Sequence, residues 1–298
     1  MMDEFFSLKT KSLALVIVVL LSLVFVGEAL ASGWNVTLTL KRDTIEDAML
    51  MPSAVFVDAE GEKYYVVDSG KNRLLSFDRQ GTLLHVFTAG GALDKPFDMV
   101  RTAEGNLWIV EKGKNSLTKI DLKEQKTIPN TLSSKGKTVY PHRLETDGNL
   151  LYVQDKASGD IIVYDKNLNE KQRIGCDSCA QGFFDFKVLG DTIWALDRLG
   201  KAVYSFSTSG ARKSVIQLGD KVTYPVSLAI GPSGYIYVLD RHQKDIAVFD
   251  QNGEFKYRFL QPGISSGQLY YPVEIRFDPW EGLCVTDEGN ARVEVYQR

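Results

Sequence analysis

The stretch PVSLAIGPSGYIYVLDRHQKDIAVFD, residues 225–250, contains the pattern that decides the fold. One hydrophobic run, IYVLD, ends at Asp240, and a second, VFD, ends ten residues later at Asp250. Alternating β-branched and aromatic residues favour half-buried strands, and the glycine and polar residues between the runs favour tight turns. The stretch therefore predicts short antiparallel strands joined by hairpin turns.

The pattern occurs six times, at intervals of 42 to 47 residues. The acids that end the first run of each copy are Asp68, Glu111, Asp155, Asp197, Asp240 and Asp287. Their strict repetition favours one structural role per copy, in which the carboxylate caps a turn. Repeats of this length that consist of strands and turns are typical of propeller blades. We therefore predict an all-β fold, a six-bladed β-propeller of four-stranded antiparallel blades.

The sixth copy has no fourth strand before Arg298. Residues 33–52 carry a Gly and a Pro 19 positions apart, as do residues 253–272, which contain the fourth strand of the fifth copy. We therefore expect Asn35–Arg42 to supply the outer strand of the last blade and to close the ring. Closure leaves only short sheet edges exposed.

The first 31 residues differ from the rest in kind. Two lysines precede the apolar run SLALVIVVLLSLVFV of 15 residues, and Ala29-Leu30-Ala31 offers a cleavage pattern of small residues. This order is typical of a secretory signal peptide, and the run is shorter than a membrane span. We expect cleavage after Ala31, with a retained signal anchor as the alternative. Residues 32–298 would then be the propeller of an exported (periplasmic, cell-surface or extracellular) protein.

The repeats resemble NHL repeats, with the pattern Pro-x-small-φ-x-φ-Asp followed by Gly-x-φ-Tyr-φ-x-Asp. The match is clearest in residues 225–250 and 52–81, and it extends from about Trp34 to the end of the chain. The resemblance implies a six-bladed propeller that binds protein, RNA or a ligand, and the family has enzymatic cousins among the amidating lyases and lactonases. The copies depart from the pattern where Gly would follow Pro, at Asp98, Arg143, Asp185, Ser227 and Glu274.

The cysteines provide information about the redox compartment in which the protein resides. Cys176 and Cys179 form a C-D-S-C motif, and Cys284 stands alone. In an oxidising compartment the close pair most simply forms a small-loop disulfide. A redox or metal role for the pair is the alternative. However, nothing predicts the helix N-terminus that would activate a thiol, and no second CxxC completes a zinc site.

Basic residues are concentrated in the loops that follow the six acids. Ten lysines and arginines, among them Arg198 and Arg241, stand there against three acids. In a propeller these loops lie on one face, which is where binding chemistry is expected. The loops would either attract an acidic partner or pair with the acids of their own blades, as common surface ion pairs do. Without residues 1–31 the chain has 33 basic and 35 acidic residues, a balance that predicts no nucleic-acid or membrane partner.

Charged residues also occupy the predicted innermost strands. Asp98, Arg143, Asp185 and Glu274 are placed at the mouth of the central channel, and Glu145, Lys187 and Arg276 two residues further along. Buried charges are costly unless they are paired or bind an ion. The set therefore predicts either a water-filled channel with alternating ion pairs or a Ca²⁺ site formed by Asp98, Asp185 and Glu274.

Only three histidines are present. His85 is assigned to an outer strand, whereas His142 is placed at the channel mouth, with Arg241 and His242 on a nearby loop. His142 and its neighbours could serve acid–base chemistry. The other interpretation is a histidine that merely lines the channel.

Two functions follow from these predictions. The first is a binding module, a monomeric propeller without chemistry of its own, whose loop-rich face meets a protein partner or extracellular ligand. Its candidate binding residues are Asp98, His142, Arg143, Asp185, Arg198, Arg241, His242 and Glu274. The second is a hydrolase or lyase, metal-assisted or not, with its site at the channel mouth. Its candidate residues are Asp98, His142, Arg143, Asp185 and Glu274. Because propellers include both binding modules and enzymes, the fold does not distinguish between these two functions.

Overall fold

The computed structural model describes residues 33–42, 44, 46–121, 124 and 126–298. The chain divides into two units, residues 1–35 with Arg298, and residues 36–297. The second unit is the predicted propeller. The predicted signal peptide, residues 1–31, lies outside the described residues. In the described part, no helix is long and apolar enough to cross a membrane.

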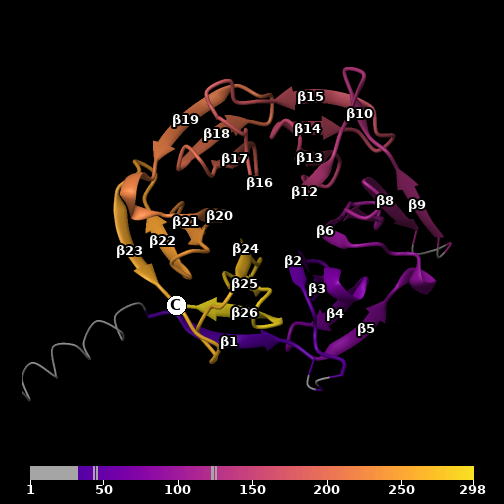
Figure 1. The fold of residues 1–298 in the computed structure, drawn as a ribbon, viewed down its shortest axis with the longest axis horizontal. Helices are drawn as coiled ribbons and strands as arrows, with labels where there is room; N and C mark the ends of the chain where they lie inside the picture. Colours follow the sequence, from indigo (N-terminus) through magenta and orange to yellow (C-terminus); the bar gives the residue numbers. More distant parts are fainter. Residues whose placement is uncertain (1–32, 43, 45, 122–123, 125) are drawn as a thin grey trace, which may run out of the picture. The chain divides into compact units, whose positions relative to one another are not determined.

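Six four-stranded antiparallel sheets surround a common axis, which confirms the predicted fold (Figure 1). Blade 1 comprises β2 (Pro52–Asp58), β3 (Lys63–Asp68), β4 (Arg73–Asp78) and β5 (Leu83–Phe87). Blade 2 comprises β6 (Pro96–Arg101), β7 (Leu107–Glu111), β8 (Ser116–Asp121) and β9 (Lys126–Asn130). Blade 3 comprises β12 (Pro141–Thr146), β13 (Leu151–Asp155), β14 (Ile161–Tyr164) and β15 (Glu170–Ile174).

The remaining blades follow the same order from the axis outward. Blade 4 comprises β16 (Asp185–Leu189), β17 (Thr192–Asp197), β18 (Ala202–Ser207) and β19 (Arg212–Gln217). Blade 5 comprises β20 (Pro225–Ile230), β21 (Ile236–Asp240), β22 (Asp245–Phe249) and β23 (Phe255–Phe259). Blade 6 comprises β24 (Pro272–Phe277), β25 (Leu283–Asp287), β26 (Arg292–Gln297) and β1 (Asn35–Leu40). The loops contain a two-stranded hairpin and three short 3₁₀ turns, namely β10 (Ser133–Ser134), β11 (Lys137–Thr138), η1 (Ser69–Lys71), η2 (Ala89–Gly91) and η3 (Gly219–Lys221).

The ring closes as the Gly-to-Pro spacing predicts. Strand β1, from the beginning of the described chain, lies beside β26 near its end, and the order of the sheet is β1-β26-β25-β24 (Figure 1). The Thr37 hydroxyl donates to the carbonyl of Val295 at 3.2 Å. Leu40 is fully buried among residues of blades 1 and 6, in a cluster that includes Val55 and Val293. The first strand therefore contributes core packing as well as an edge.

The six repeated acids all end the second strand of a blade, and each is buried. Their carboxylates accept backbone N–H bonds from the loops beside them. Asp240, for example, accepts from Tyr224 just before β20 and from His242 just after β21. Asp287 likewise accepts from Tyr271 just before β24. The acids therefore hold the loops of one face in place, in agreement with the predicted capping role.

Candidate functional site

The innermost strands bring seven charged side chains together on the ring axis, and we call this set the axial cluster. Its members come from four blades and are Asp98, Arg143, Glu145, Asp185, Lys187, Glu274 and Arg276. Side chains two residues apart point to the same side of a strand. Charged residues two positions apart on an inner strand, such as Arg143 and Glu145, therefore both face the axis. The residues predicted to lie at the channel mouth do come together there.

The axial cluster is held by alternating ion pairs. Lys187 Nζ lies 3.2 Å from Asp185, 3.6 Å from Glu145 and 3.9 Å from Glu274. Arg276 donates to Glu145 at 2.8 Å. Arg143 lies 3.8 Å from a carboxylate oxygen of Asp185 and donates to two backbone carbonyl oxygens, including that of Val273 at 3.0 Å. This arrangement supplies the pairing that buried charges need.

The acids of the cluster also join neighbouring blades. Asp98 on blade 2 accepts from the backbone N–H of Leu144 on blade 3 at 3.0 Å. Asp185 on blade 4 accepts from Leu228 on blade 5 at 3.0 Å. Glu274 on blade 6 accepts from the backbone N–H of Val55 on blade 1 at 2.8 Å, so the same type of hydrogen bond also joins the first and last blades. These bonds give the cluster a structural role.

The side chains of the cluster are more enclosed than a channel mouth implies. Asp98, Arg143, Asp185 and Glu274 are each at most 3% exposed, because the long arginine and lysine side chains occupy the axis beside them. Three of the four, Asp98, Asp185 and Glu274, are the predicted Ca²⁺ ligands, and a cation would have to displace the contacts described above. In the described part of the chain, no group of three or more His, Cys, Asp or Glu is placed to hold a metal ion. The Ca²⁺ site remains a prediction.

The cluster contains four acids and three bases, and burial is the largest influence on the pKa values of Asp98, Glu145 and Asp185. Burial raises the pKa of Asp98 to about 7, although the nearby Arg143 opposes the shift. Burial also raises the pKa of Glu145. Burial acts in the same direction on Asp185, but Lys187 and Arg143 outweigh it, and the pKa of Asp185 is lowered. Asp185 is therefore ionised at neutral pH, whereas Asp98 titrates near neutral pH.

His142, at the loop side of the axial cluster, lies between two aromatic rings. Its ring centroid is 4.9 Å from that of Phe97 and 5.6 Å from that of Phe184. Burial, together with Lys112 and Arg143, lowers the pKa of His142 well below its usual value, so the imidazole is neutral at pH 7. Its described contacts are with Phe97 of blade 2, Gln154 of blade 3 and Phe184 at the start of blade 4. The predicted grouping with Arg241 and His242 is therefore not made by direct contact within the described chain.

Two arginines of the loop-rich face stack on tyrosines of the following blade. Arg198 lies 4.9 Å from the ring of Tyr224 and donates to its hydroxyl at 3.0 Å. Arg241 lies 4.5 Å from the ring of Tyr271 and donates to its hydroxyl at 3.2 Å. Stacking and hydrogen bonding hold each guanidinium in one orientation. His242, in contrast, is exposed, and its backbone N–H donates to Asp240.

The basic loops therefore divide between the two predicted roles. Arg73 pairs with Asp68 at 2.8 Å, and Lys114 pairs with Glu111 at 2.9 Å, so each of these bases pairs with the acid of its own blade. In blades 4 and 5, the arginine directly after the blade acid contacts a tyrosine of the next blade instead. These tyrosines are not among the binding residues predicted from the sequence. The available signal was a tyrosine directly before the proline that opens an inner strand, at Tyr140, Tyr224 and Tyr271.

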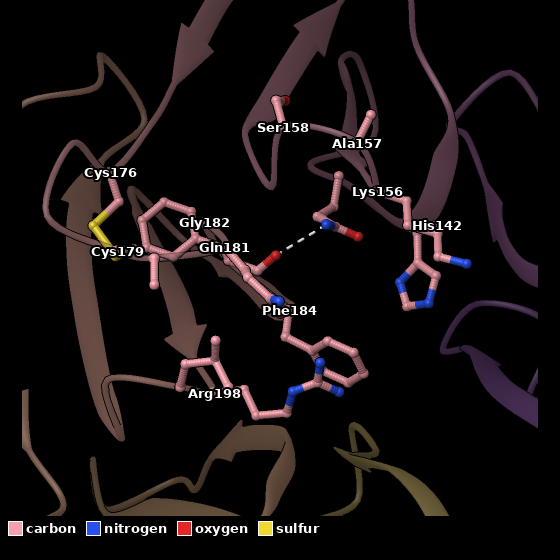
Figure 2. A pocket seen from close by; sticks show the side chains of 14 residues that line it. His142, Lys156, Ala157, Ser158, Cys176, Cys179, Gln181, Gly182, Phe184 and Arg198 are labelled. Atoms are coloured by element: carbon pink, nitrogen blue, oxygen red, sulfur yellow. Dashed lines mark hydrogen bonds between the residues drawn. A yellow bond between two sulfur atoms is a disulfide. The ribbon is translucent and has the colours of Figure 1, made fainter.

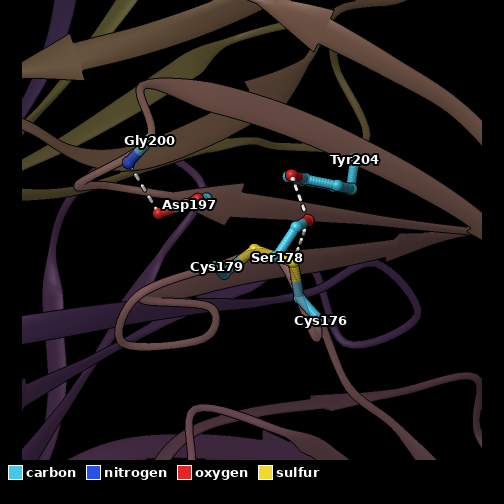
Figure 3. The surroundings of a disulfide bond; sticks show 6 residues. All are labelled: Cys176, Ser178, Cys179, Asp197, Gly200 and Tyr204. Atoms are coloured by element: carbon cyan, nitrogen blue, oxygen red, sulfur yellow. Dashed lines mark hydrogen bonds between the residues drawn. A yellow bond between two sulfur atoms is a disulfide. The ribbon is translucent and has the colours of Figure 1, made fainter.

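A cavity of about 460 Å³ lies between the loops of blades 3 and 4 (Figure 2). His142, Lys156, Phe184 and Arg198 contribute to its wall, together with the loop that carries Cys176 and Cys179. The two cysteines form the predicted disulfide (Figure 3). The hydroxyl of Ser178, between them, lies 3.4 Å from that of Tyr204. Cys284 is a free, buried thiol in blade 6.

Solved structures with a similar fold are six-bladed propellers. Virginiamycin B lyase from Staphylococcus aureus is 15% identical, with a TM-score of 0.61 and coverage of 82% of this chain and 79% of that chain. A gluconolactonase from Xanthomonas campestris is 16% identical, with a TM-score of 0.63 and 87% of each chain covered. An auxiliary nutrient binding protein from Bacteroides thetaiotaomicron is 14% identical, with a TM-score of 0.64 and coverage of 89% and 76%.

These similarities establish the propeller architecture. At such low sequence identities, the similarities establish the fold but not the activity. No protein-family model matches the sequence, and neither does any curated protein sequence. The assignment to NHL repeats therefore remains a prediction.

Proposed function

We propose that this protein is an exported binding module that holds a protein partner or extracellular ligand on its loop-rich face. The observation that carries the proposal is the pair of stacked contacts, Arg198 with Tyr224 and Arg241 with Tyr271. Tyrosine and arginine are the residues most enriched at the energetic centres of protein interfaces. Here they are already ordered before any partner arrives, which reduces the entropy cost of binding.

The surroundings of these pairs support the same proposal. Tyr224 and Tyr271 are 40% and 45% exposed, and Tyr140, at the equivalent position of blade 3, is 47% exposed. Aromatic side chains that remain exposed at repeated positions of one face form the kind of patch that marks an interaction site. The Cys176–Cys179 disulfide supports export, because such bonds persist in oxidising compartments.

The proposal is tested by comparing two tyrosines at opposite ends of one blade. Tyr224 precedes β20 on the loop-rich face, whereas Tyr235, 38% exposed, lies in the turn between β20 and β21 at the other end. A partner identified by crosslinking in the exported fraction of the producing cells is titrated against both variants. We expect Tyr224→Ala to weaken binding by about thirtyfold, as for an interface hot spot, and Tyr235→Ala to leave it unchanged. Equal effects of the two substitutions would contradict the proposal.

A hydrolase or lyase is the second candidate, and one observation favours it. His142 lines the cavity, and its lowered pKa keeps the imidazole in the neutral form that accepts a proton. Against this candidate, Asp98, Asp185 and Glu274 are committed to ion pairs and backbone N–H groups. Hydrolysis of gluconolactone and cleavage of virginiamycin B, each measured with and without Ca²⁺, test it. Turnover that is lost in His142→Phe would establish it.

A further inference from the structure

The cavity between blades 3 and 4 is built from four segments of the loop-rich face. They are the start of β12, the loop after β13, the loop that leads into β16 and the loop after β17. Figure 2 shows His142, Lys156 and Arg198 from three of these segments around the same space. A volume of about 460 Å³ is within the range of sites that enclose small organic ligands.

The residues that line the cavity carry a net positive charge. Lys156 and Arg198 are among the residues that line it, and none of the lining residues is Asp or Glu. The described contacts of Arg198 are with neutral groups, namely the ring of Phe184 at 3.8 Å and the hydroxyl of Tyr224. Lys156 is exposed and, in the described part of the chain, forms no ion pair. Two cations without a counter-charge attract an anion.

Two buried polar side chains of the cavity wall, His142 and Gln154, interact with each other. The amide of Gln154 is fixed, because its Nε2 atom donates to the carbonyl of Phe183 at 2.9 Å. His142 and Gln154 are only 7% and 3% exposed, so they form a fixed part of the cavity wall.

The rest of the wall is apolar. The ring of Phe184, the side chain of Leu199 and the Cys176–Cys179 disulfide border the cavity. Arg198 already stacks on Phe184, and this platform suits a second flat group. This apolar wall favours an organic acid over inorganic phosphate, which has no apolar body to place against it.

We propose that this cavity binds a small organic acid. Its carboxylate would pair with Lys156 and Arg198, and its apolar body would lie against Phe184 beneath the disulfide loop. The inference deepens the proposed function, on which it rests, because it assigns a ligand class to one part of the loop-rich face. Its test does not require the protein partner.

The test compares acids with their neutral amides. Benzoate and benzamide, and indole-3-acetate and indole-3-acetamide, are titrated against the whole protein by ligand-observed NMR up to about 10 mM, with inorganic phosphate as a third arm. We expect at least one acid to bind about tenfold more tightly than its amide, since a charge-assisted contact is roughly twice as strong as a neutral one. Phosphate binding at least as tight as that of either acid would overturn the assignment of the ligand class.

Two variants locate the site. Lys156→Ala and Arg198→Ala should each reduce the affinity for the acid by about tenfold and remove its advantage over the amide. Lys166→Ala is the matched control, because Lys166 lies in a separate cavity and pairs with Glu104 on the surface. It makes the same change of charge, and we expect it to leave the affinity unchanged. Equal binding of acid and amide, no binding of any acid, or an equal loss in the control would overturn the inference.

The failure of this inference and that of the proposed function are distinguishable. Tyr271 lies outside the cavity wall and contacts Arg241 instead. If Tyr271→Ala weakens partner binding but no acid enters the cavity, only the ligand assignment fails. If acids bind as described but Tyr271→Ala leaves partner binding unchanged, the proposed interface fails and the cavity stands.

Discussion

Replacing Lys187 with methionine removes the cation that joins most of the axial cluster. Its ammonium lies within 4 Å of Asp185, Glu145 and Glu274, and its side chain is 11% exposed. The substitution keeps the length of the side chain, so the main change is electrostatic. The cluster then contains four acids and two bases instead of four and three. Breaking a buried ion pair by removing one partner costs about 3–5 kcal/mol, and we expect a loss of that size in the free energy of unfolding.

Chemical denaturation followed by tryptophan fluorescence measures this loss at pH 8 and pH 5. The loss should be smaller at pH 5, because protonation of a carboxyl removes part of the excess negative charge. Lys166→Met is the control, since Lys166 is 68% exposed in a surface pair with Glu104 and should tolerate the change.

A double substitution separates charge from packing. Adding Glu145→Gln to Lys187→Met restores the excess to one acid and should recover part of the lost stability. The reasoning is refuted if Lys187→Met costs less than about 1 kcal/mol, the scale of a surface pair, or if the double variant is no more stable than the single one.

Three other expectations concern the ring itself. The raised pKa of Asp98 gives a stabilising contribution that is fully present below pH 3.8 and is lost as the pH rises to about 7. The wild type should therefore lose stability relative to Asp98→Asn across this pH range, which denaturation at a series of pH values measures. Parallel curves of stability against pH for the two proteins would contradict this expectation. Leu40→Ala should lower the free energy of unfolding by about 2–5 kcal/mol and lower the temperature of the single thermal transition of the whole ring. Asn35→Ala, on the same strand, is the control and should change neither quantity. A transition in which β1 alone is lost would argue against closure of the ring by this strand. Reduction of the Cys176–Cys179 disulfide should lower the free energy of unfolding by about 2 kcal/mol, as expected for so short a loop, with Cys284→Ser as the control that leaves the effect intact.

The architecture could be predicted from the sequence because it depends on short-range chemistry that repeats. Each blade has the same strands, turns and capping acid, so six weak signals reinforce one another. The closure by β1 was predictable because the Gly33-to-Pro52 spacing repeats that of another blade. The disulfide followed from the close spacing of Cys176 and Cys179.

The candidate site was only partly predictable, because it depends on contacts between blades. The axial residues were identified, since a charge at an inner-strand position breaks the pattern of the repeat. Their enclosure was not, because it depends on how far Arg143 and Lys187 reach across the axis. The stacking of Arg198 on Tyr224 links residues of different blades, and neither residue alone distinguishes such a contact from an ordinary surface position. The cavity beside His142 likewise forms only when loops of two blades meet.

The central claim is that the loop-rich face is the binding surface, and site-specific photo-crosslinking tests it most directly. A benzophenone side chain replaces Tyr271 on that face in one sample and Tyr235 at the opposite end of the blades in another. After irradiation in the exported fraction, we expect a discrete adduct from position 271 and none from position 235. An adduct from position 235 alone, or identical adducts from both positions, would contradict it.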